Sequence, residues 1–219
     1  MHNVTVAFAV LLVMLLSYFF GCFNGSFMIS HFIIRDDVRK HGSGNAGLTN
    51  FYRTYGAKYA LLVIACDMGK TVAACLLGSF FFRCLGWDGT LGTLLAGLGC
   101  ELGHIFPVFY GFRGGKGILS GGTLVLLLNW RVAAVAWALF LLLWLTTRYV
   151  SLASITATCS APITVYFVYG HNWLYTSLCL AVAALVVWCH RENIQRLLHG
   201  TEKKFKWHVN PTEGKDPPK

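Results

Sequence analysis

A polar, glycine-rich segment between two long apolar runs holds the residues best suited to chemistry in this 219-residue sequence. Residues 41–50 read HGSGNAGLTN, and Arg53 follows closely. Glycine lets the backbone turn tightly and approach a ligand, while hydroxyls, amides and backbone N–H groups donate hydrogen bonds to anions. The segment therefore predicts a phosphate site at a membrane surface. Its candidate ligands are Gly42, Ser43, Gly44, Asn45, Thr49, Asn50 and Arg53.

A second glycine-rich segment, residues 111–117, reads GFRGGKG. It is not a complete P-loop, because Gly117 stands where that motif has Ser or Thr to bind magnesium. Gly114, Gly115 and Gly117 around Lys116 still predict a cationic cluster of N–H groups that binds phosphate. The alternative is an ordinary flexible turn.

Three further polar residues lie at the ends of apolar runs. His190 and Asn193 are three residues apart, so they share one face of a helix. Histidine exchanges protons readily near neutral pH, although a polar helix end is the simpler interpretation. Ser151 is placed to cap a helix and present that helix's N-terminus to an anion; capping alone also explains it.

Two pairs of ionisable residues lie inside apolar runs. Asp67 and Lys70 are three residues apart, and Glu101 and His104 repeat that spacing. Charged groups at membrane depth usually face a functional site or each other. A structural Asp–Lys pair and a role in the site are therefore both open.

The composition indicates an integral membrane protein. Hydrophobic residues make up 56% of the chain and charged residues 12%, against about 25% charged in soluble domains. The apolar runs do not alternate as barrel strands do, so an all-α polytopic fold is expected. The net charge is +9, but the basic residues are scattered over several loops, so no nucleic-acid partner is expected. No cluster has metal-ligand spacing, so neither a metal nor a cofactor is expected.

Charge distribution decides the predicted topology. Five basic residues lie in segment 35–58 and seven in the tail 190–219. With seven spans both lie on the same side, as the positive-inside tendency favours, whereas six spans would bury Arg131. We expect seven transmembrane helices in one catalytic domain, residues 1–200, and a basic, polar cytoplasmic tail, residues 201–219, with the N-terminus extracytoplasmic. The apolar runs are 4–34, 59–82, 89–109, 117–130, 132–147, 149–170 and 173–189.

These motifs resemble those of the bacterial acyl-phosphate:glycerol-3-phosphate acyltransferases, the PlsY family. The resemblance covers about residues 15–205. Its motifs are GSGN at 42–45 with Thr49, Asn50 and Arg53, GH at 103–104 with FPVF at 106–109, GFRGGKG at 111–117, RYVSLASI at 148–155 and HRENI at 190–194.

The resemblance implies transfer of a fatty acyl group from acyl phosphate to position 1 of glycerol 3-phosphate, which yields lysophosphatidic acid and phosphate in phospholipid synthesis. It implies a multi-pass protein of the bacterial inner (plasma) membrane with its active site on the cytoplasmic side. The expected partners are the two substrates and membrane lipids, with no obligate protein partner. The implied catalytic residues are Ser43, Arg53, Lys116, His190 and Asn193, and Thr49 and Ser151 join them in holding the two phosphates.

Two questions stay open at this point. The proton of the attacking hydroxyl passes either to His190 or to the substrate's own phosphate, and the resemblance favours the phosphate. The competing class is a transporter of a phosphorylated metabolite. Transporters often show internal repeats and mid-membrane sites, whereas here the polar residues concentrate in loops on one predicted side, which favours an enzyme.

Overall fold

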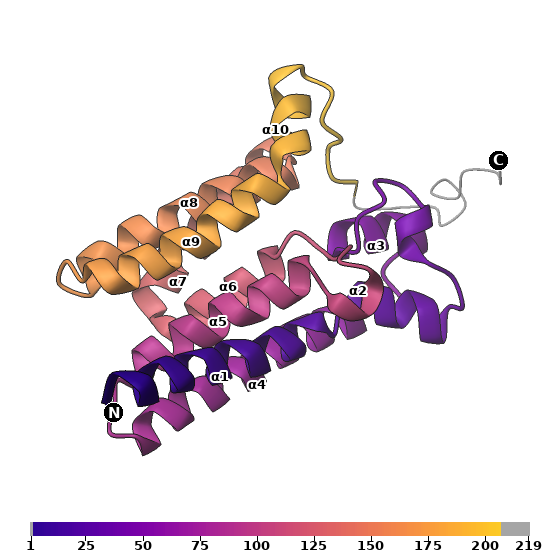
Figure 1. Cartoon of the computed structure of the whole chain (residues 1–219). Coiled ribbons are helices and arrows are strands. Elements are labelled where there is room, and N and C mark those ends of the chain that lie inside the picture. Colours follow the sequence, from indigo (N-terminus) through magenta and orange to yellow (C-terminus); the bar gives the residue numbers. More distant parts are fainter. Residues whose placement is uncertain (1, 207–219) are drawn as a thin grey trace.

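The computed structural model describes residues 2–206, and every regular element among them is helical (Figure 1). The predicted all-α fold is therefore confirmed for this part of the chain. Each predicted apolar run contains one main helix. These helices are α1 (His2–Cys22), α4 (Ala60–Cys84), α5 (Gly89–Ile105), α6 (Ile118–Leu128), α7 (Trp130–Thr147), α8 (Val150–Val168) and α9 (Trp173–Cys189).

Length and composition identify five candidate membrane spans within residues 2–206. They are Val4–Ile33, Ala60–Cys84, Gly89–Tyr110, Trp130–Thr147 and Val150–Val168. Helix α9 gives a sixth if it is counted with α10 (Arg191–Leu198), which bends away from it by 59°. Helix α6 has 11 residues, a length of about 16 Å against a hydrocarbon core of about 30 Å. A multi-pass membrane fold is thus supported, while the count of seven spans stays a prediction.

The two short apolar runs form separate helices rather than one long one. Asn129 is extended, with φ −164°, and its side chain accepts a hydrogen bond from the Arg131 backbone N–H at 2.9 Å, which caps α7. Arg131 is exposed in the first turn of α7, with its guanidinium over the Trp130 ring. The break therefore places this arginine at the exposed start of α7 and not in the middle of one long helix.

The first apolar run is broken after α1. Residues Phe23 and Asn24 interrupt the helix before α2 (Gly25–Met28), which continues into a π-helical turn, η1 (Ile29–Ile33). Asn24 caps α2 by accepting the Phe27 N–H at 2.9 Å. The amide group of Asn24 also donates to the Ala46 carbonyl at 2.9 Å, so this break fastens the first glycine-rich segment to the bundle.

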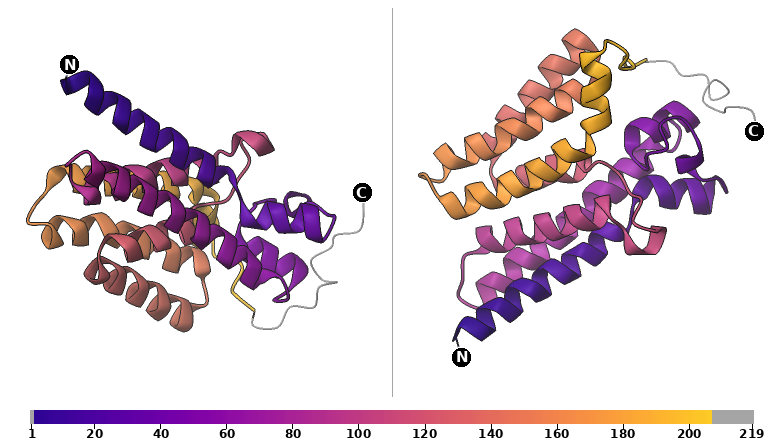
Figure 2. Two further views of the ribbon diagram at one scale, coloured as in Figure 1. Left: turned by 90° about the horizontal axis from the view of Figure 1, so that it is seen from below. Right: turned by 45° about the horizontal axis from the view of Figure 1, so that its top comes forward.

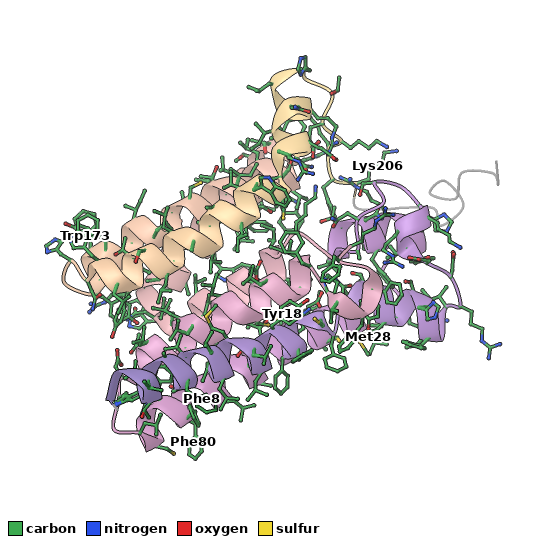
Figure 3. The ribbon with its side chains drawn as sticks, in the orientation of Figure 1. Phe8, Tyr18, Met28, Phe80, Trp173 and Lys206 are labelled. Atoms are coloured by element: carbon green, nitrogen blue, oxygen red, sulfur yellow. The ribbon has the colours of Figure 1, made fainter. Side chains whose placement is uncertain are left out.

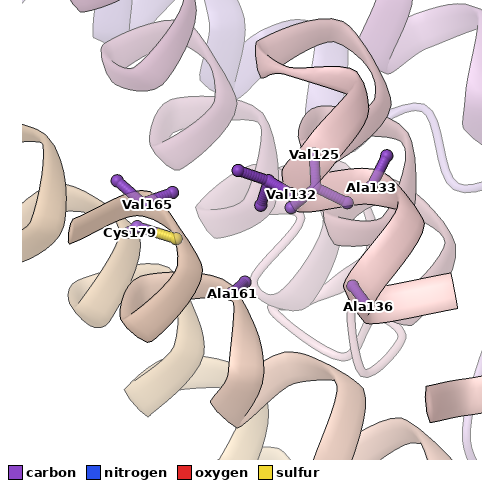
Figure 4. Packing of buried hydrophobic residues seen from close by; sticks show 7 residues of the cluster. All are labelled: Val125, Val132, Ala133, Ala136, Ala161, Val165 and Cys179. Carbon is purple, nitrogen blue, oxygen red and sulfur yellow. The ribbon is translucent and has the colours of Figure 1, made fainter. Parts of the chain in front are cut away.

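The helices form two layers, which are joined by α6 and by a direct contact between α5 and α9. Helices α1, α4 and α5 pack together, α7, α8 and α9 pack together, and α6 contacts both groups (Figures 1 and 2). Helices α1 and α5 approach closely because glycine faces backbone: a Cβ at Gly103 would overlap the Tyr18 carbonyl, as is usual for membrane helices. The second layer and α6 pack through one apolar cluster (Figure 4), made of Val125, Val132, Ala133, Ala136, Ala161, Val165 and Cys179.

Apolar side chains also cover the outside of the bundle, as expected for a surface in contact with lipid. Phe8 and Phe80 are each 66% exposed on the outer side of the first layer (Figure 3). The short elements gather at the opposite end from the start of α1 (Figure 1). Besides α10 these are η2 (Val38–Lys40), α3 (Leu48–Tyr55) and η3 (Val108–Tyr110).

A buried polar cluster fixes the base of this end. The ammonium group of Lys70 pairs with Asp67 at 2.8 Å and donates to the carbonyls of Gly21 and Phe23 at 3.1 and 3.0 Å. It also lies 2.7 Å from Nδ1 of His104. Asp67 in turn accepts the Gly25 N–H at 3.0 Å. The Asp67–Lys70 pair therefore joins α4 to the broken end of α1. This contact supports the structural interpretation of the pair. Asp67 and His104 also reach the cavity wall.

Candidate active site

A cavity of about 830 Å³ opens at the polar end and brings most of the predicted site residues together. These residues come from segments that are far apart in the sequence. The predicted residues that line it are Gly42, Ser43, Asn45, Thr49, Asn50, Arg53, Lys116, Gly117, Ser151, His190 and Asn193. Gly44, Gly114 and Gly115 do not line it.

Asn50 organises the first glycine-rich segment. Its side-chain oxygen accepts the Ser43 N–H at 2.9 Å, and its amide donates to the carbonyls of Val38 and His41 at 3.1 and 3.0 Å. Gly42 has φ +57°, and a Cβ there would overlap the Asn50 oxygen. Because both polar ends of the buried Asn50 side chain are occupied, Asn50 positions Ser43 instead of presenting a free donor.

The second glycine-rich segment packs on α5. The N–H groups of Gly114 and Gly115 donate to the carbonyls of Ile105 and His104, both at 3.1 Å, and a Cβ at either glycine would overlap His104. The prediction that these two N–H groups bind phosphate therefore needs correction, because they already have partners. Gly114 and Gly115 are therefore needed for close packing, and Lys116 is the residue of this segment that can contact an anionic ligand.

The two glycine-rich segments also contact each other. The Gly114 carbonyl accepts the Ala46 N–H at 3.4 Å and the Asn45 side-chain amide at 3.5 Å. Together with the Asn24–Ala46 bond, these contacts fix the relative position of the two segments. Ser43 and Lys116 are thereby held on the wall of one cavity.

Glu202 is the residue that sequence reasoning missed. Its Oε1 accepts from the Ser151 hydroxyl and the Asn193 amide, both at 2.7 Å, and its Oε2 accepts from Arg196 Nε at 2.7 Å. The side-chain oxygen of Asn193 accepts a hydrogen bond from Lys116. A chain of contacts thus joins four elements of the site. Arg196 continues the three-residue spacing of His190 and Asn193, a signal that points to it. Glu202 is one of three acids in the basic tail 201–219 and has no such signal.

Glu202, Lys203 and Phe205, from the segment that follows α10, line the cavity. The Lys203 carbonyl accepts from the Arg53 guanidinium at 3.2 Å, and the Phe205 N–H donates to the Arg148 carbonyl at 2.8 Å. The Phe205 ring lies 5.4 Å from Tyr52 and 5.3 Å from Trp144, between ring centres. The first residues of the predicted basic, polar tail, 201–206, therefore make specific contacts with the site, and we call them the strap. Residues 207–219 of the predicted tail lie outside the described residues.

Cations outnumber anions around this cavity. Lys116, Arg53 and Arg196 line it together with the carboxylate of Glu202 and, deeper, Asp67. Burial raises the pKa of Glu202, but the hydrogen bonds from Arg196, Ser151 and Asn193 outweigh burial and hold the pKa below its usual value. Burial lowers the pKa of Lys116 and of Arg53. An anion bound in this cavity would offset the cost of burying these cations.

His190 is buried at the junction of α9 and α10. Burial, reinforced by the positive charge of Lys116, lowers the pKa of His190 to about 4, although the bond to Val186 acts in the opposite direction. The imidazole is therefore neutral near pH 7. Its Nδ1 lies 2.7 Å from the Val186 carbonyl, which only accepts hydrogen bonds, so Nδ1 carries the proton and Nε2 is left as an acceptor.

Away from its polar end the cavity is apolar. It continues between α7, α8 and α9 past Trp137, Phe140 and Ala157 and reaches Ala161 and Val182. Val125, Ala136, Ala161 and Cys179 of its deep wall belong to the apolar cluster of Figure 4. A polar, cationic end joined to a long apolar body fits an anionic amphiphile. Among residues 2–206, no group of three or more His, Cys, Asp or Glu side chains is placed to hold a metal ion.

Comparisons with known proteins agree on one family. The family model described as glycerol-3-phosphate acyltransferase matches residues 11–200. The chain is 38% identical over 192 residues to the glycerol-3-phosphate acyltransferase of Syntrophomonas wolfei, covering 88% of this chain and 95% of that protein. It is 38% identical over 189 residues to that of Finegoldia magna, covering 86% and 92%.

Solved structures of PlsY, an integral membrane glycerol 3-phosphate acyltransferase, have the same fold. The glycerol 3-phosphate form superposes with a TM-score of 0.81 at 36% identity, covering 90% of this chain and 96% of that one. The lysophosphatidic acid form gives a TM-score of 0.78 at 35% identity, covering 90% and 95%.

Proposed function

This chain belongs to the glycerol-3-phosphate acyltransferase family, and we propose that it transfers a fatty acyl group from acyl phosphate to position 1 of glycerol 3-phosphate. It is an integral membrane acyltransferase. The observation that carries the proposed donor is the shape of the cavity, whose cationic end continues into an apolar body. The products are lysophosphatidic acid and inorganic phosphate.

The proposed reaction needs several positive charges at one place. Glycerol 3-phosphate and the acyl phosphate headgroup both carry negative charge, so their approach is opposed unless cations lie between them. Lys116 and Arg53 supply those cations, and the hydroxyls of Ser43 and Thr49, which also line the cavity, supply neutral donors. The Ser151 hydroxyl, expected from the resemblance to hold phosphate, already donates to Glu202. Asn193 places the Lys116 ammonium. Hydrogen-bond donors that are already positioned around the acyl carbonyl before the reaction also stabilise the oxyanion that develops there.

The proposed bond changes are simple. The hydroxyl at position 1 attacks the acyl carbonyl carbon, a C–O ester bond forms, and the C–O bond to phosphate breaks. The hydroxyl proton leaves with the phosphate, directly or by way of His190. Neutral His190 has an unprotonated Nε2, which can accept a hydrogen bond from a hydroxyl group. A phosphate oxygen is itself an acceptor, so it is a poorer partner for Nε2. We therefore assign His190 to the glycerol hydroxyl.

Acyl phosphate suits the cavity better than larger donors. The strap and α3 surround its polar end, where Arg53 bonds to the Lys203 carbonyl. A headgroup of one phosphate fits beside Lys116, whereas a nucleotide or a carrier protein needs a docking surface of its own. The acyl chain then lies along the apolar wall of α7, α8 and α9.

The proposed topology has seven spans, with the active site facing the cytoplasm of a bacterial inner (plasma) membrane. The strongly basic segments 35–58 and 190–219 belong on one side by the positive-inside tendency. In support, α3 and residues 201–206 lie together at the end opposite the start of α1 (Figure 1). We assign residues 1–200 to one catalytic domain.

Phosphate release by the purified protein tests the proposal. With palmitoyl phosphate and glycerol 3-phosphate in detergent, phosphate and lysophosphatidic acid should appear in equal amounts. Palmitoyl-CoA and palmitoyl-carrier protein, assayed in parallel, should give no product. Comparable turnover with palmitoyl-CoA would reject the donor while keeping the acyltransferase class. The transporter alternative is not favoured by the family match, and it predicts no turnover in detergent.

A further inference from the structure

One buried histidine at the cavity wall has no role in the proposed reaction. His104 lies in the last turn of α5 and is 3% exposed, yet it lines the cavity. Its backbone carbonyl accepts the Gly115 N–H at 3.1 Å, so its main chain is occupied by packing. What His104 can offer to a ligand therefore depends on its two ring nitrogens and their partners.

The surroundings of Nδ1 decide where the ring proton of His104 lies. Nδ1 is 2.7 Å from the ammonium group of Lys70, which pairs with Asp67 at 2.8 Å. An ammonium group only donates hydrogen bonds, so Nδ1 accepts and carries no proton. The Asp67 carboxylate is 3.7 Å from Nδ1, too far to accept a hydrogen bond from it. A second ring proton would also point at the positive charge of Lys70. His104 is therefore neutral, with its single ring proton on Nε2.

Nε2 is thus a hydrogen-bond donor, and no group within residues 2–206 accepts from it. The ring makes its hydrogen bond in this part of the chain through Nδ1. The Ala46 carbonyl, which lies nearby across Gly115, already accepts the amide group of Asn24 at 2.9 Å. Nε2 is not one of the fully enclosed polar atoms that lack a partner. Because the rest of His104 is buried and the residue lines the cavity, this donor faces the cavity.

The Nε2 atom lies where the two glycine-rich segments meet. A Cβ built on Gly115 would overlap His104 Nε2 and would lie 3.0 Å from the Ala46 carbonyl oxygen. Lys116, which follows Gly115 in the chain, lines the same cavity. The turn that carries Lys116 therefore packs directly against the imidazole ring, and a side chain at position 115 would cover the Nε2 donor.

We propose that His104 is a further phosphate-binding residue, whose Nε2–H group donates to the phosphate that Lys116 attracts. Phosphate oxygens accept hydrogen bonds, and a neutral donor adds a fixed contact without adding another positive charge to the cavity. Lys70 is then a positioning residue, because its ammonium group keeps the ring proton on Nε2. The same proton prevents His104 from acting as a general base. The inference rests on the proposed role of Lys116 as a phosphate ligand.

Phosphate binding by the purified protein in detergent tests the inference separately from turnover. Inorganic phosphate should raise the thermal unfolding midpoint of the wild-type protein, because a ligand of the folded state stabilises it. Two substitutions separate the two ring nitrogens. In His104→Asn the side-chain oxygen can still accept from Lys70, but the side chain is too short to place a donor at the position of Nε2. In His104→Gln the longer side chain carries its amide nitrogen to that position.

The two variants should therefore differ in phosphate binding. His104→Asn should weaken it at least about tenfold, as expected for one lost hydrogen bond to a charged group, and should lower kcat/KM for acyl transfer to match. His104→Gln should keep both values close to those of the wild type. Cys100→Ala is the matched control, since Cys100 lies one turn earlier on α5, is 0% exposed and faces Thr71 of α4; its phosphate binding should not change.

Each outcome supports or overturns the assignment of His104. Unchanged phosphate binding in His104→Asn would overturn it, as would an equal loss in His104→Asn and His104→Gln or a wild-type midpoint that does not respond to phosphate. If His104→Asn does not fold, His104→Ala replaces it; failure of both, or of His104→Gln, would make the ring purely structural and also overturn the inference. A protein that binds phosphate as expected but does not turn over acyl phosphate would reject the proposed function and leave the assignment of His104 standing.

Discussion

Removal of the Glu202 carboxylate should show whether the strap organises the site or blocks it. Three donors converge on this carboxylate, from Ser151, Asn193 and Arg196. Hydrogen bonds to a charged group contribute about 1.5–3 kcal/mol each. The Arg196 side chain is 37% exposed, so we reduce its share to at most about 1 kcal/mol. Glu202→Ala therefore removes roughly 3–7 kcal/mol of interactions that hold the strap and orient Asn193.

A loss of about 3 kcal/mol in organising the site corresponds to a roughly 100-fold lower kcat/KM for glycerol 3-phosphate. Steady-state phosphate release measures this, and limited proteolysis after residue 198 reports release of the strap. Glu192→Ala is the matched control: Glu192 also faces Arg196, at 3.9 Å, but is 65% exposed, so its loss should cost less than about 0.5 kcal/mol. Higher activity or a lower KM in Glu202→Ala would refute the reasoning, because it would mean that the carboxylate competes with substrate phosphate for the same donors.

Three further predictions concern the charge, the pH dependence and the topology of the protein. Lys116→Ala should lower turnover about 10²–10³-fold without unfolding the protein, as loss of one preset charge-stabilising group does; near-normal phosphate release would reject its role. Because the pKa of His190 is lowered to about 4 from about 6.5 in unfolded chains, the unfolded state binds the extra proton, so stability should fall as pH decreases from about 6.5 to 4. His190→Gln should reduce that slope in thermal unfolding, and an identical slope would contradict the assigned protonation state. In a cysteine-free background, cysteines placed at positions 40 and 204 should not react with an impermeant reagent in intact cells; labelling of either would refute the seven-span topology.

The positions of the main helices follow from the sequence because hydrophobic length is a local property. Each apolar run contains one main helix, and the break at Asn129 coincides with the charge at Arg131. The number of spans does not follow from hydrophobicity in the same way. Run 117–130 is largely apolar, yet only 11 of its residues form α6, since Gly117 and Asn129 bound this helix on either side. Composition cannot tell a spanning helix from a short one packed between two layers.

The glycines of 114–117 show where sequence reasoning fails. A glycine is needed both where backbone N–H groups surround an anion and where a Cβ would collide with a neighbour. The sequence GGKG is compatible with both. The structure separates the two cases, because Gly114 and Gly115 donate to α5 and lie against His104. Lys116 remains the phosphate candidate on grounds of charge.

Glu202 was unpredictable because its partners are distant in the chain and its own surroundings are misleading. It follows a helix end and precedes two lysines, which is the pattern of a solvated tail. Its function in the structure depends on Ser151, which lies 51 residues away, and on a cavity formed by both helix layers. Contacts of this kind leave no periodic trace in a single sequence.

The network around Lys116 suggests how the site remains stable before substrate binds. A buried ammonium without a partner would destabilise the fold, and Asn193 provides a neutral acceptor for it. Asn193 is in turn oriented by Glu202, which also holds Ser151. A phosphate group carries more negative charge than an amide oxygen, so it attracts the ammonium more strongly. In the proposed reaction a phosphate would therefore displace Asn193 from Lys116, while the hydrogen bond to Glu202 keeps the Asn193 amide in place.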